Sequence, residues 1–164
     1  MTDRDTEIAE ASPSETDTIA DLWVALARGQ REHESHLLPE PNRTRVRERL
    51  ARYAATGQLL VARSAAGDRE SRIVGFVTFV TRNDQYEVDC RRGLVENLYV
   101  VPDRRGEGVG SGLLSRAEQR LHEAGVDSIS LEAMADNEAA RRFYRRHGYE
   151  PHRVEFEKST DTER

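Results

Sequence analysis

The chain has 164 residues, a formal net charge of −5, 37% hydrophobic residues and 34% charged residues. This length suits one domain with a buried core. No apolar run approaches the roughly 18 residues of a membrane span, and the acidic start, residues 1–5, lacks the apolar segment of a signal peptide. The single cysteine, Cys90, excludes an internal disulfide framework and a cysteine-based zinc finger. We expect one domain over 1–164, frayed at 1–5 and 159–164, in a reducing cytoplasm.

Charge is spread unevenly along the chain. Residues 1–42 hold 10 acidic residues and 3 arginines, whereas residues 43–164 hold 20 acidic and 22 basic residues. The only lysine is Lys158, so no Walker A loop is present. A lysine Schiff base could form only at that position. Because the whole chain is acidic, we expect no nucleic-acid partner, and nothing in it predicts a membrane partner.

The first half predicts a strand, two helices and two further strands. Residues 6–11 form the first strand, and a helix opens at 12–15, where proline suits the first turn, and ends near Gly29. A second helix follows over 43–55, with Val46, Leu50 and Tyr53 inward. Alternating polarity then predicts strands over 58–63 and 72–81, around a turn at 66–68.

The second half alternates strands with helices. Strands are predicted over 93–101, 128–133 and 153–158, and helices over 109–124 and 137–147, with glycines directly after each helix. The whole order is β α α β β β α β α β. It predicts an α/β fold with a mixed sheet, mostly antiparallel in its first half, in which a crossover helix joins strands 93–101 and 128–133.

A glycine-rich stretch lies where strand 93–101 ends and helix 109–124 begins, with glycines at 106, 108, 110 and 112. Free N–H groups and the dipole at a helix N-terminus bind anions, and glycine lets a phosphate approach the backbone closely. The spacing does not fit the dinucleotide pattern G-x-G-x-x-G, whose third glycine would fall on Ser111 or Leu113. The stretch therefore predicts a pyrophosphate site; a tight turn with glycines for packing is the alternative.

Three segments carry a family resemblance. Arg105-x-x-Gly108-x-Gly110 resembles the acyl-CoA signature Q/R-x-x-G-x-G/A of the GCN5-related N-acetyltransferases (GNAT). The preceding strand, residues 95–100, and the segment from Asn137 to Tyr149, similar to N-x-x-A-x-x-F-Y-x-x-x-G-F/Y, also have that family's form. Tyr149, where phenylalanine is commoner, and a longer turn at 65–71 are departures. The resemblance implies a single-domain GNAT-like fold, with a mostly antiparallel central sheet flanked by helices and strands 93–101 and 128–133 splayed apart.

The resemblance also implies a cosubstrate, acetyl-CoA, and no metal. The loop N–H groups would hold its pyrophosphate, and its pantetheine arm would bond to strand 93–101 like an added strand. A backbone N–H near Val100 would polarise the thioester carbonyl. The implied cofactor-binding residues are Leu98, Tyr99, Val100, Arg105, Gly106, Glu107, Gly108, Val109, Gly110, Ser111, Asn137, Ala140 and Phe143.

The implied reaction is direct acetyl transfer to a primary amine. The amine must first lose a proton, which at pH 7 costs about 4.6 kcal/mol for a lysine-like amine and about 1.4 kcal/mol for an α-amine. Glu96 is the candidate base, acting through a water; an ion pair with a neighbouring arginine is its alternative role. Tyr144 is the candidate acid for the leaving thiolate, or else a core aromatic. Asn137 is expected to cap its helix, to contact the pantetheine arm, or both.

Other charged residues have weaker assignments. A solvated surface is the simpler reading of the helix arginines at 43–52 and of those at 141–146, although the latter could bind the CoA 3′-phosphate. His33 and His36 lie a turn apart without an evident third metal ligand. Cys90 is expected to be a structural or partly exposed thiol. Six acidic residues in the expected acceptor region could favour a cationic amine, or could simply be solvated: Glu32, Glu34, Glu40, Asp84, Glu87 and Asp89.

Three functions stay open at this level. The first is an acetyl-CoA-dependent N-acetyltransferase acting on a small amine, a protein N-terminus or a lysine. The second is a catalytically silent acyl-CoA sensor or scaffold with the same fold. The third is a nucleotide-binding regulator, which ATP or NAD binding at the glycine loop would reveal. A homodimer is compatible with the family resemblance.

Overall fold

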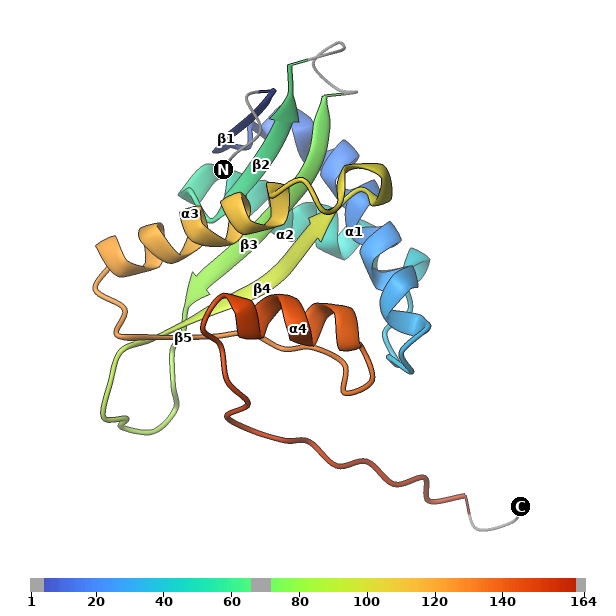
Figure 1. Cartoon of the computed structure of the whole chain (residues 1–164), viewed down its shortest axis with the longest axis vertical. Coiled ribbons are helices and arrows are strands. Elements are labelled where there is room, and N and C mark those ends of the chain that lie inside the picture. The colour runs from blue at the N-terminus through green and yellow to red at the C-terminus, as the bar shows by residue number, and fades with distance from the viewer. Residues whose placement is uncertain (1–4, 66–71, 162–164) are drawn as a thin grey trace.

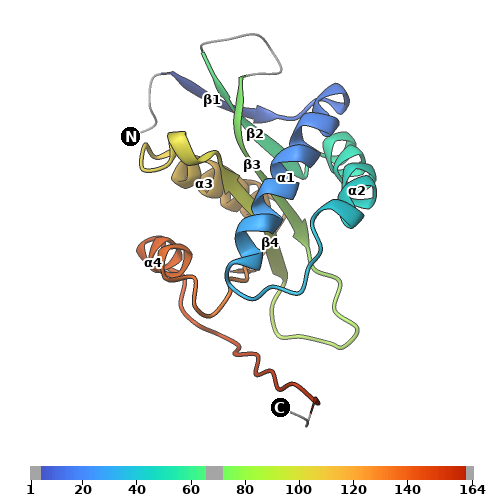
Figure 2. The same cartoon turned by 90° about the vertical axis from the view of Figure 1, so that its right-hand side faces the viewer.

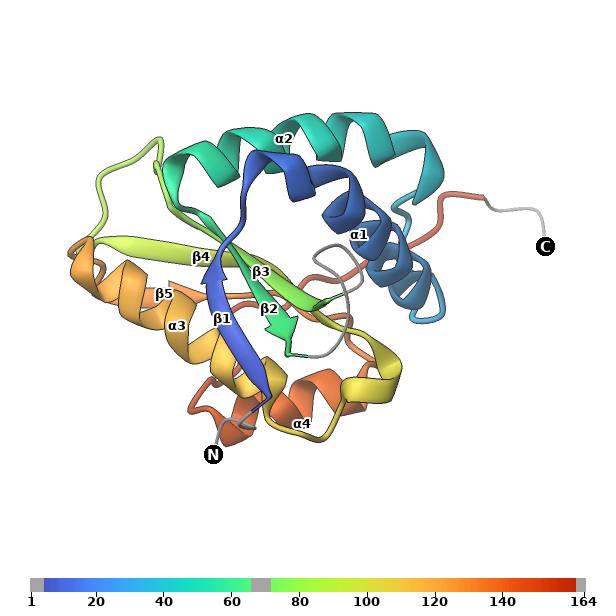
Figure 3. The same cartoon turned by 90° about the horizontal axis from the view of Figure 1, so that it is seen from above.

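The computed structural model describes residues 5–65 and 72–161. A five-stranded sheet lies between two layers of helices (Figures 1 and 3). Its strands are β1 (Thr6–Glu10), β2 (Leu59–Ser64), β3 (Ile73–Thr81), β4 (Arg92–Val100) and β5 (Ser128–Ser130). One face carries α1 (Thr16–Arg31) and α2 (Arg43–Thr56), and the other carries α3 (Val109–Glu123) and α4 (Glu138–Arg146). Three short 3₁₀ turns are η1 (Pro13–Glu15), η2 (Glu40–Asn42) and η3 (Pro102–Arg104).

The strand order is β1-β2-β3-β4-β5. The first four strands pair antiparallel, and β4 pairs parallel with β5 across the α3 crossover. This last pairing runs only from Arg92↔Ser128 to Leu94↔Ser130, after which the two strands part. The predicted mixed, mostly antiparallel sheet with splayed fourth and fifth strands is confirmed.

Two apolar cores hold the layers together. Helices α1 and α2 bury Ile19, Trp23 and Leu50 against Phe76 of β3. On the other face, α3 buries its own apolar stripe: Val109, Leu113, Leu114, Ala117 and Leu121. The middle strands β2 and β3 are apolar on both faces because helices cover both sides of the sheet. Of the α2 residues predicted to face inward, Leu50 is buried, and Val46 and Tyr53 are partly buried against the same core.

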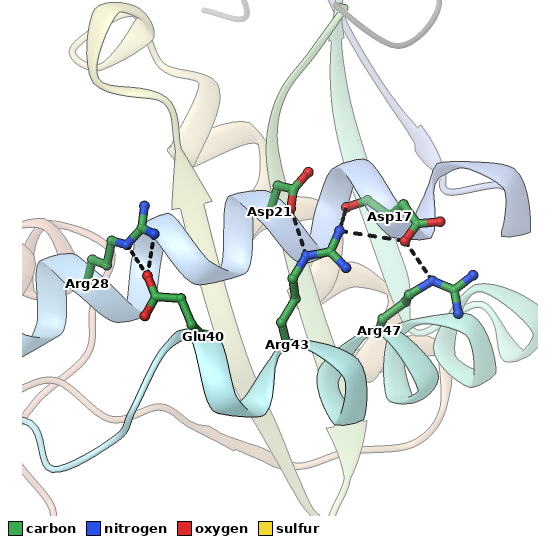
Figure 4. Close-up of polar contacts among 6 residues, drawn as sticks. All are labelled: Asp17, Asp21, Arg28, Glu40, Arg43 and Arg47. Atoms are coloured by element: carbon green, nitrogen blue, oxygen red, sulfur yellow. Dashed lines mark hydrogen bonds and ion pairs between the residues drawn. The ribbon is translucent and has the colours of Figure 1, made fainter.

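Polar contacts run along the seam between α1 and α2 (Figure 4). Arg43 donates from Nε to Asp21 Oδ1 at 2.8 Å, and Arg47 donates from Nε to Asp17 Oδ1 at 2.7 Å. Each exposed pair is worth less than about 1 kcal/mol. Two of the five arginines of α2 therefore pair with acidic residues of α1, as a solvated helix face allows.

One ion pair lies in the interior. Glu15 is only 4% exposed, and its carboxylate accepts from the Ser12 N–H at 2.8 Å and from the Arg63 guanidinium. The hydrogen bonds compensate a charge that would otherwise be costly to bury. This pair connects the turn before α1 to β2.

The predicted last strand, 153–158, is wrong. Residues 149–161 form no helix or strand, and the segment runs away from the sheet (Figures 1 and 2). Val154 and Phe156, the apolar residues that alternate with charged ones in this segment, are 67% and 91% exposed. Alternation describes a side-chain pattern, but a strand also needs a neighbouring strand for its backbone, and residues 153–158 have none among the described strands. A side-chain contact does reach this segment: His36 Nε2 lies 2.7 Å from Glu157 Oε2.

Other differences are small. The predicted strand 128–133 ends at Ser130 because β5 loses its partner where β4 turns away. The predicted turn at 66–68 and most of the longer turn at 65–71 lie outside the described residues. Asp5 and residues 159–161 are exposed and belong to no element. No helix in the described part of the chain is long and apolar enough to cross a membrane.

Candidate active site

The glycine loop leads from the end of β4 into α3. Gly106 has φ 79° and Gly108 has φ 87°, a backbone region that other residues rarely adopt. Gly108 is also the N-cap of α3, and because it has no side chain it caps none of the helix's first N–H groups. The first N–H groups of an α-helix have no intrahelical partner, so the loop leaves them open at the positive end of the helix dipole.

Two arginines brace this loop. Arg105 donates from Nε to the Val100 carbonyl at 2.9 Å, and its guanidinium lies 5.5 Å from the centre of the Tyr99 ring. Arg104 donates from Nε to Glu107 Oε2 at 2.7 Å. The first contact ties the loop to the end of β4. The second offsets the negative charge of Glu107, which lies between Gly106 and Gly108 and would otherwise oppose an anion.

The backbone of β4 faces two ways near its end. The Val101 N–H bonds to the Val74 carbonyl at 2.9 Å, so the alternate residues Val100 and Leu98 direct their backbone groups away from β3. That side is where β5 has already parted from β4. Two residues predicted to bind a pantetheine arm thus present strand-edge groups to the splayed gap.

Tyr99 is arranged differently from its neighbours. Its ring is 9% exposed and packs near Phe76, with ring centres 6.4 Å apart. By the same alternation, its backbone groups face β3. The structure therefore makes Tyr99 a core residue that supports Arg105 rather than one that faces the gap.

Helix α4 packs beside the glycine loop. Asn137 Oδ1 accepts from the Ala140 N–H at 3.2 Å, which confirms the predicted N-cap. A Cβ placed on Gly110 would lie 3.5 Å from Phe143 Cζ, so the Phe143 ring covers the first turn of α3. His147 completes the contact: Nδ1 donates to the Phe143 carbonyl at 2.8 Å, which leaves Nε2 of the neutral ring to accept from Ser111 Oγ at 3.0 Å.

Tyr144 lies on the side of the sheet covered by α3 and α4. Its ring is in edge contact with Phe143 and with Tyr149, at centroid distances of 5.5 and 6.1 Å. Burial raises the pKa of Tyr144, so its hydroxyl stays protonated at neutral pH and can donate. The buried Tyr149 hydroxyl has no hydrogen-bond partner among the described residues, and burial, followed by Glu118, raises its pKa too.

Glu96 is the extra residue of a β-bulge. Asn97 pairs with Thr78 and Val95 pairs with Phe79, so Glu96 has no opposite residue on β3. The bulge resets the alternation of β4. The Glu96 carboxylate accepts from Tyr53 Oη on α2 at 2.9 Å, while Asn97 Nδ2 donates to Thr78 Oγ1 at 2.8 Å on the same face.

The two candidate catalytic residues therefore approach β4 from opposite faces. Glu96 points toward α2, and Tyr144 lies with α3 and α4. The contact of Glu96 with Tyr53 was not predicted, because the spacing of α2 marked Tyr53 only as an inward aromatic residue. The alternative role of Glu96 was an ion pair with a neighbouring arginine. Among the described residues, no arginine pairs with Glu96.

The remaining candidates lie elsewhere. A hollow of about 620 Å³ opens at the β3–β4 loop, between residues 82–92, Ser128, His152 and Arg153. It contains the partly exposed Cys90, whose thiol pKa is raised chiefly by burial. This hollow adjoins Arg92, at the opposite end of β4 from the glycine loop.

The two neighbouring histidines and two of the six acidic residues of the expected acceptor region pair with other side chains. His33 lies 3.1 Å from Asp136, and His36 contacts Glu157. In residues 5–65 and 72–161, no three metal-ligating side chains are grouped to hold an ion. Of the acidic residues, Glu40 pairs with Arg28 and Asp84 with Arg92.

Two of the α4 arginines also make contacts within the protein. Arg141 donates to the Ala135 carbonyl at 2.8 Å, and Arg146 lies over the Phe143 ring.

A family model for the acetyltransferase (GNAT) family matches residues 19–149. The match covers most of the chain, including β4, the glycine loop and α4. The chain therefore belongs to the GNAT family.

Individual relatives agree with this. Mycothiol acetyltransferase of Clavibacter sepedonicus is 38% identical over 131 residues, which are 77% of this chain and 38% of that enzyme. Aminoalkylphosphonate N-acetyltransferase of Salmonella typhimurium is 36% identical over 67 residues, 41% of this chain and 44% of that enzyme. The chain thus spans less than half the length of either relative. The NatC complex bound to Gag peptide and CoA contains a chain with the same fold, with TM-score 0.68 and 17% identity over 87% of this chain and 83% of that one.

Proposed function

We propose that this chain is an acetyl-CoA-dependent N-acetyltransferase, folded as one domain over residues 1–164, which transfers acetyl directly to a primary amine in a ternary complex. The observation that carries the proposal is the arrangement along β4. The glycine loop with its two left-handed glycines follows this strand, and Glu96 stands at a bulge within it. An anion-binding loop, a free strand edge and a candidate base therefore come from one continuous segment.

The residues present fit acetyl-CoA. Its pyrophosphate would lie against the loop from Arg105 to Ser111, where the N–H groups at the start of α3 are open and a side chain at Gly106 or Gly108 would impose backbone strain. Backbone groups of Leu98 and Val100 would bond the pantetheine arm, with a Val100 N–H beside the thioester oxygen. When bound, acetyl-CoA supplies an activated acyl group.

Glu96 and Tyr144 would handle the protons. The protonated amine loses one proton, through a water, to the Glu96 carboxylate, and the neutral nitrogen then forms the new C–N bond as the C–S bond breaks. The nitrogen's second proton passes to solvent, which in turn reprotonates Tyr144. The Tyr144 hydroxyl, kept protonated by its raised pKa, would donate to the departing sulfur. The positions of these side chains on opposite faces of β4 support this division, since the proton acceptor and the proton donor serve opposite ends of the reacting group.

The acceptor is proposed only as a class. The two relatives described above are named for aminoalkylphosphonate and mycothiol acetylation, so a small amine is the first choice and a protein N-terminus the second. The arginine pairs of Glu40 and Asp84 weaken the idea that acidic side chains there attract a cationic amine. A reducing cytoplasm remains the proposed setting.

Calorimetric titration of acetyl-CoA into the protein tests the site. Gly108→Asp would place a side chain and a negative charge beside the pyrophosphate. Gly125→Asp is the matched control, because Gly125 also has a positive φ, 81°, and lies past the other end of α3. We expect Gly108→Asp to weaken binding more than about tenfold, equivalent to about 1.4 kcal/mol, and Gly125→Asp to bind normally.

Two results would contradict the proposal. One is a folded wild type that releases no heat with acetyl-CoA; the other is equal weakening by both variants. Thiol release from acetyl-CoA with a panel of small amines, peptide N-termini and lysine peptides then separates the enzyme from a silent sensor. Binding without release on any amine would favour the sensor.

A further inference from the structure

Tyr53 makes a contact that the proposed reaction does not yet use. Its hydroxyl donates to Glu96 Oε2 at 2.9 Å, across the boundary between α2 and β4. The two residues are 43 positions apart in the chain, so the contact depends on how α2 docks on the sheet. No hydrogen bond within the described part of the chain involves the other carboxylate oxygen, Oε1.

Backbone hydrogen bonds and core packing together hold Tyr53 in place. Its carbonyl accepts from the N–H of Gly57, the left-handed residue that ends α2, and from the N–H of Gln58 at 2.9 Å. One turn earlier, Leu50 is 2% exposed and anchors the helix in the core. The Tyr53 ring packs on the same core. The hydroxyl is thus held in place by backbone and packing.

Burial and the contact with Glu96 keep the Tyr53 hydroxyl a hydrogen-bond donor. Burial raises the pKa of Tyr53 to about 12, with the hydrogen bond to Glu96 as the second cause, and nearby Arg49 and Arg52 only partly oppose this. The phenol therefore stays protonated throughout the pH range of an enzyme assay. A phenol that keeps its proton can orient a carboxylate but cannot replace it as a base.

We propose that Tyr53 is the positioning residue of the base: it holds Glu96 Oε2 so that Oε1 faces the water that takes the amine proton. The inference rests on the proposed function and adds to it a residue from α2. During the reaction, Glu96 Oε1 gains the proton, the amine loses it through the water, and Tyr53 keeps its own. Catalysis by a base depends on such geometry, because proton transfer needs an oxygen within hydrogen-bond reach.

Four variants test the role: Tyr53→Phe, Glu96→Gln, the double variant and Tyr86→Phe. Tyr86 is 83% exposed on the β3–β4 loop and serves as the matched loss of a phenol hydroxyl. The measurements are kcat and KM for the amine and Kd for acetyl-CoA. We expect Tyr53→Phe to lower kcat about tenfold, a fraction of what a general base contributes, with Kd for acetyl-CoA unchanged. The kcat of Tyr86→Phe should equal that of the wild type.

Two readouts separate positioning from mere packing. In the Glu96→Gln background, Tyr53→Phe should cause no further loss of kcat, since its effect passes through the carboxylate. The loss should also be larger for an amine of high pKa than for an α-amine, because the first depends more on a base. A packing role would lower activity equally in both backgrounds and for both amines.

The outcomes distinguish the two proposals. If Glu96→Gln loses activity but Tyr53→Phe does not, or if their losses multiply, the positioning role is overturned and the base stands. If Glu96→Gln keeps the wild-type kcat, the base assignment fails and the positioning role falls with it. If the wild type binds acetyl-CoA and acetylates no amine, both proposals are overturned.

Discussion

Replacing Gly108 and Gly110 by alanine, one at a time, should change stability in opposite directions. At Gly108, with φ 87°, a Cβ meets the strain of the left-handed region, about 1–2 kcal/mol. Gly110 lies in the first turn of α3, where an added Cβ would be 3.5 Å from Phe143 and 3.7 Å from Val100, ordinary contact distances. Alanine there should add about 0.5–1 kcal/mol through its helix propensity. The two variants should differ by about 2 kcal/mol.

Urea unfolding followed by fluorescence measures this difference, since the single tryptophan, Trp23, is 6% exposed in the core. Gly57→Ala is the control for backbone strain alone. It has φ 75° at the end of α2, remote from the glycine loop, and should lose as much stability as Gly108→Ala. A stable Gly108→Ala, or a Gly110→Ala destabilised by more than about 1 kcal/mol, would refute the loop geometry.

Three further predictions concern single side chains. Arg63→Met should lower the free energy of unfolding by about 3 kcal/mol in urea titrations, because it removes a guanidinium that pairs with the buried Glu15 carboxylate; a loss below about 1 kcal/mol would contradict this. Tyr144→Phe should reduce kcat while Kd for acetyl-CoA is retained, which steady-state kinetics and calorimetry check together. Burial raises the pKa of Glu118, so its charged form is disfavoured in the folded protein. Glu118→Gln should therefore raise Tm at pH 8, by an amount that shrinks toward zero as the pH falls below 4.5, the carboxyl's ordinary value.

The sequence was sufficient for most of the fold because its signals were local. The apolar stripe of α3 and the glycines that end α2, α3 and α4 each act within one turn of the chain. The Asn137 cap was likewise readable from a single side chain at a helix start. The glycine loop combined a strand end, positive-φ residues and a helix start in one stretch, so its geometry followed from neighbouring residues.

Features that depend on distant pairing could not be read in the same way. The hydrogen bond of Tyr53 to Glu96 joins residues that only the docking of α2 brings together. The segment 153–158 has the alternation of a strand, but no described strand pairs with it, and periodicity alone cannot supply a partner. The brace from Arg105 to the Val100 carbonyl was hidden for a different reason, since the motif predicted only its backbone role.

The bulge at Glu96 lies between the residue proposed as the base and the strand edge proposed to bind the acyl donor. An extra residue bends its strand and shifts the alternation beyond it. Here β4 leaves β5 after Leu94, just before the bulge, and the residues after it face the resulting gap. Without the shift, Asn97 would point to the other face of the sheet, and Leu98 and Val100 would exchange positions with the core-facing Tyr99. One inserted residue therefore aligns the strand edge proposed to bind the acyl donor directly after the proposed base, whose carboxylate contacts α2, so the proposed arrangement of both depends on the same backbone feature.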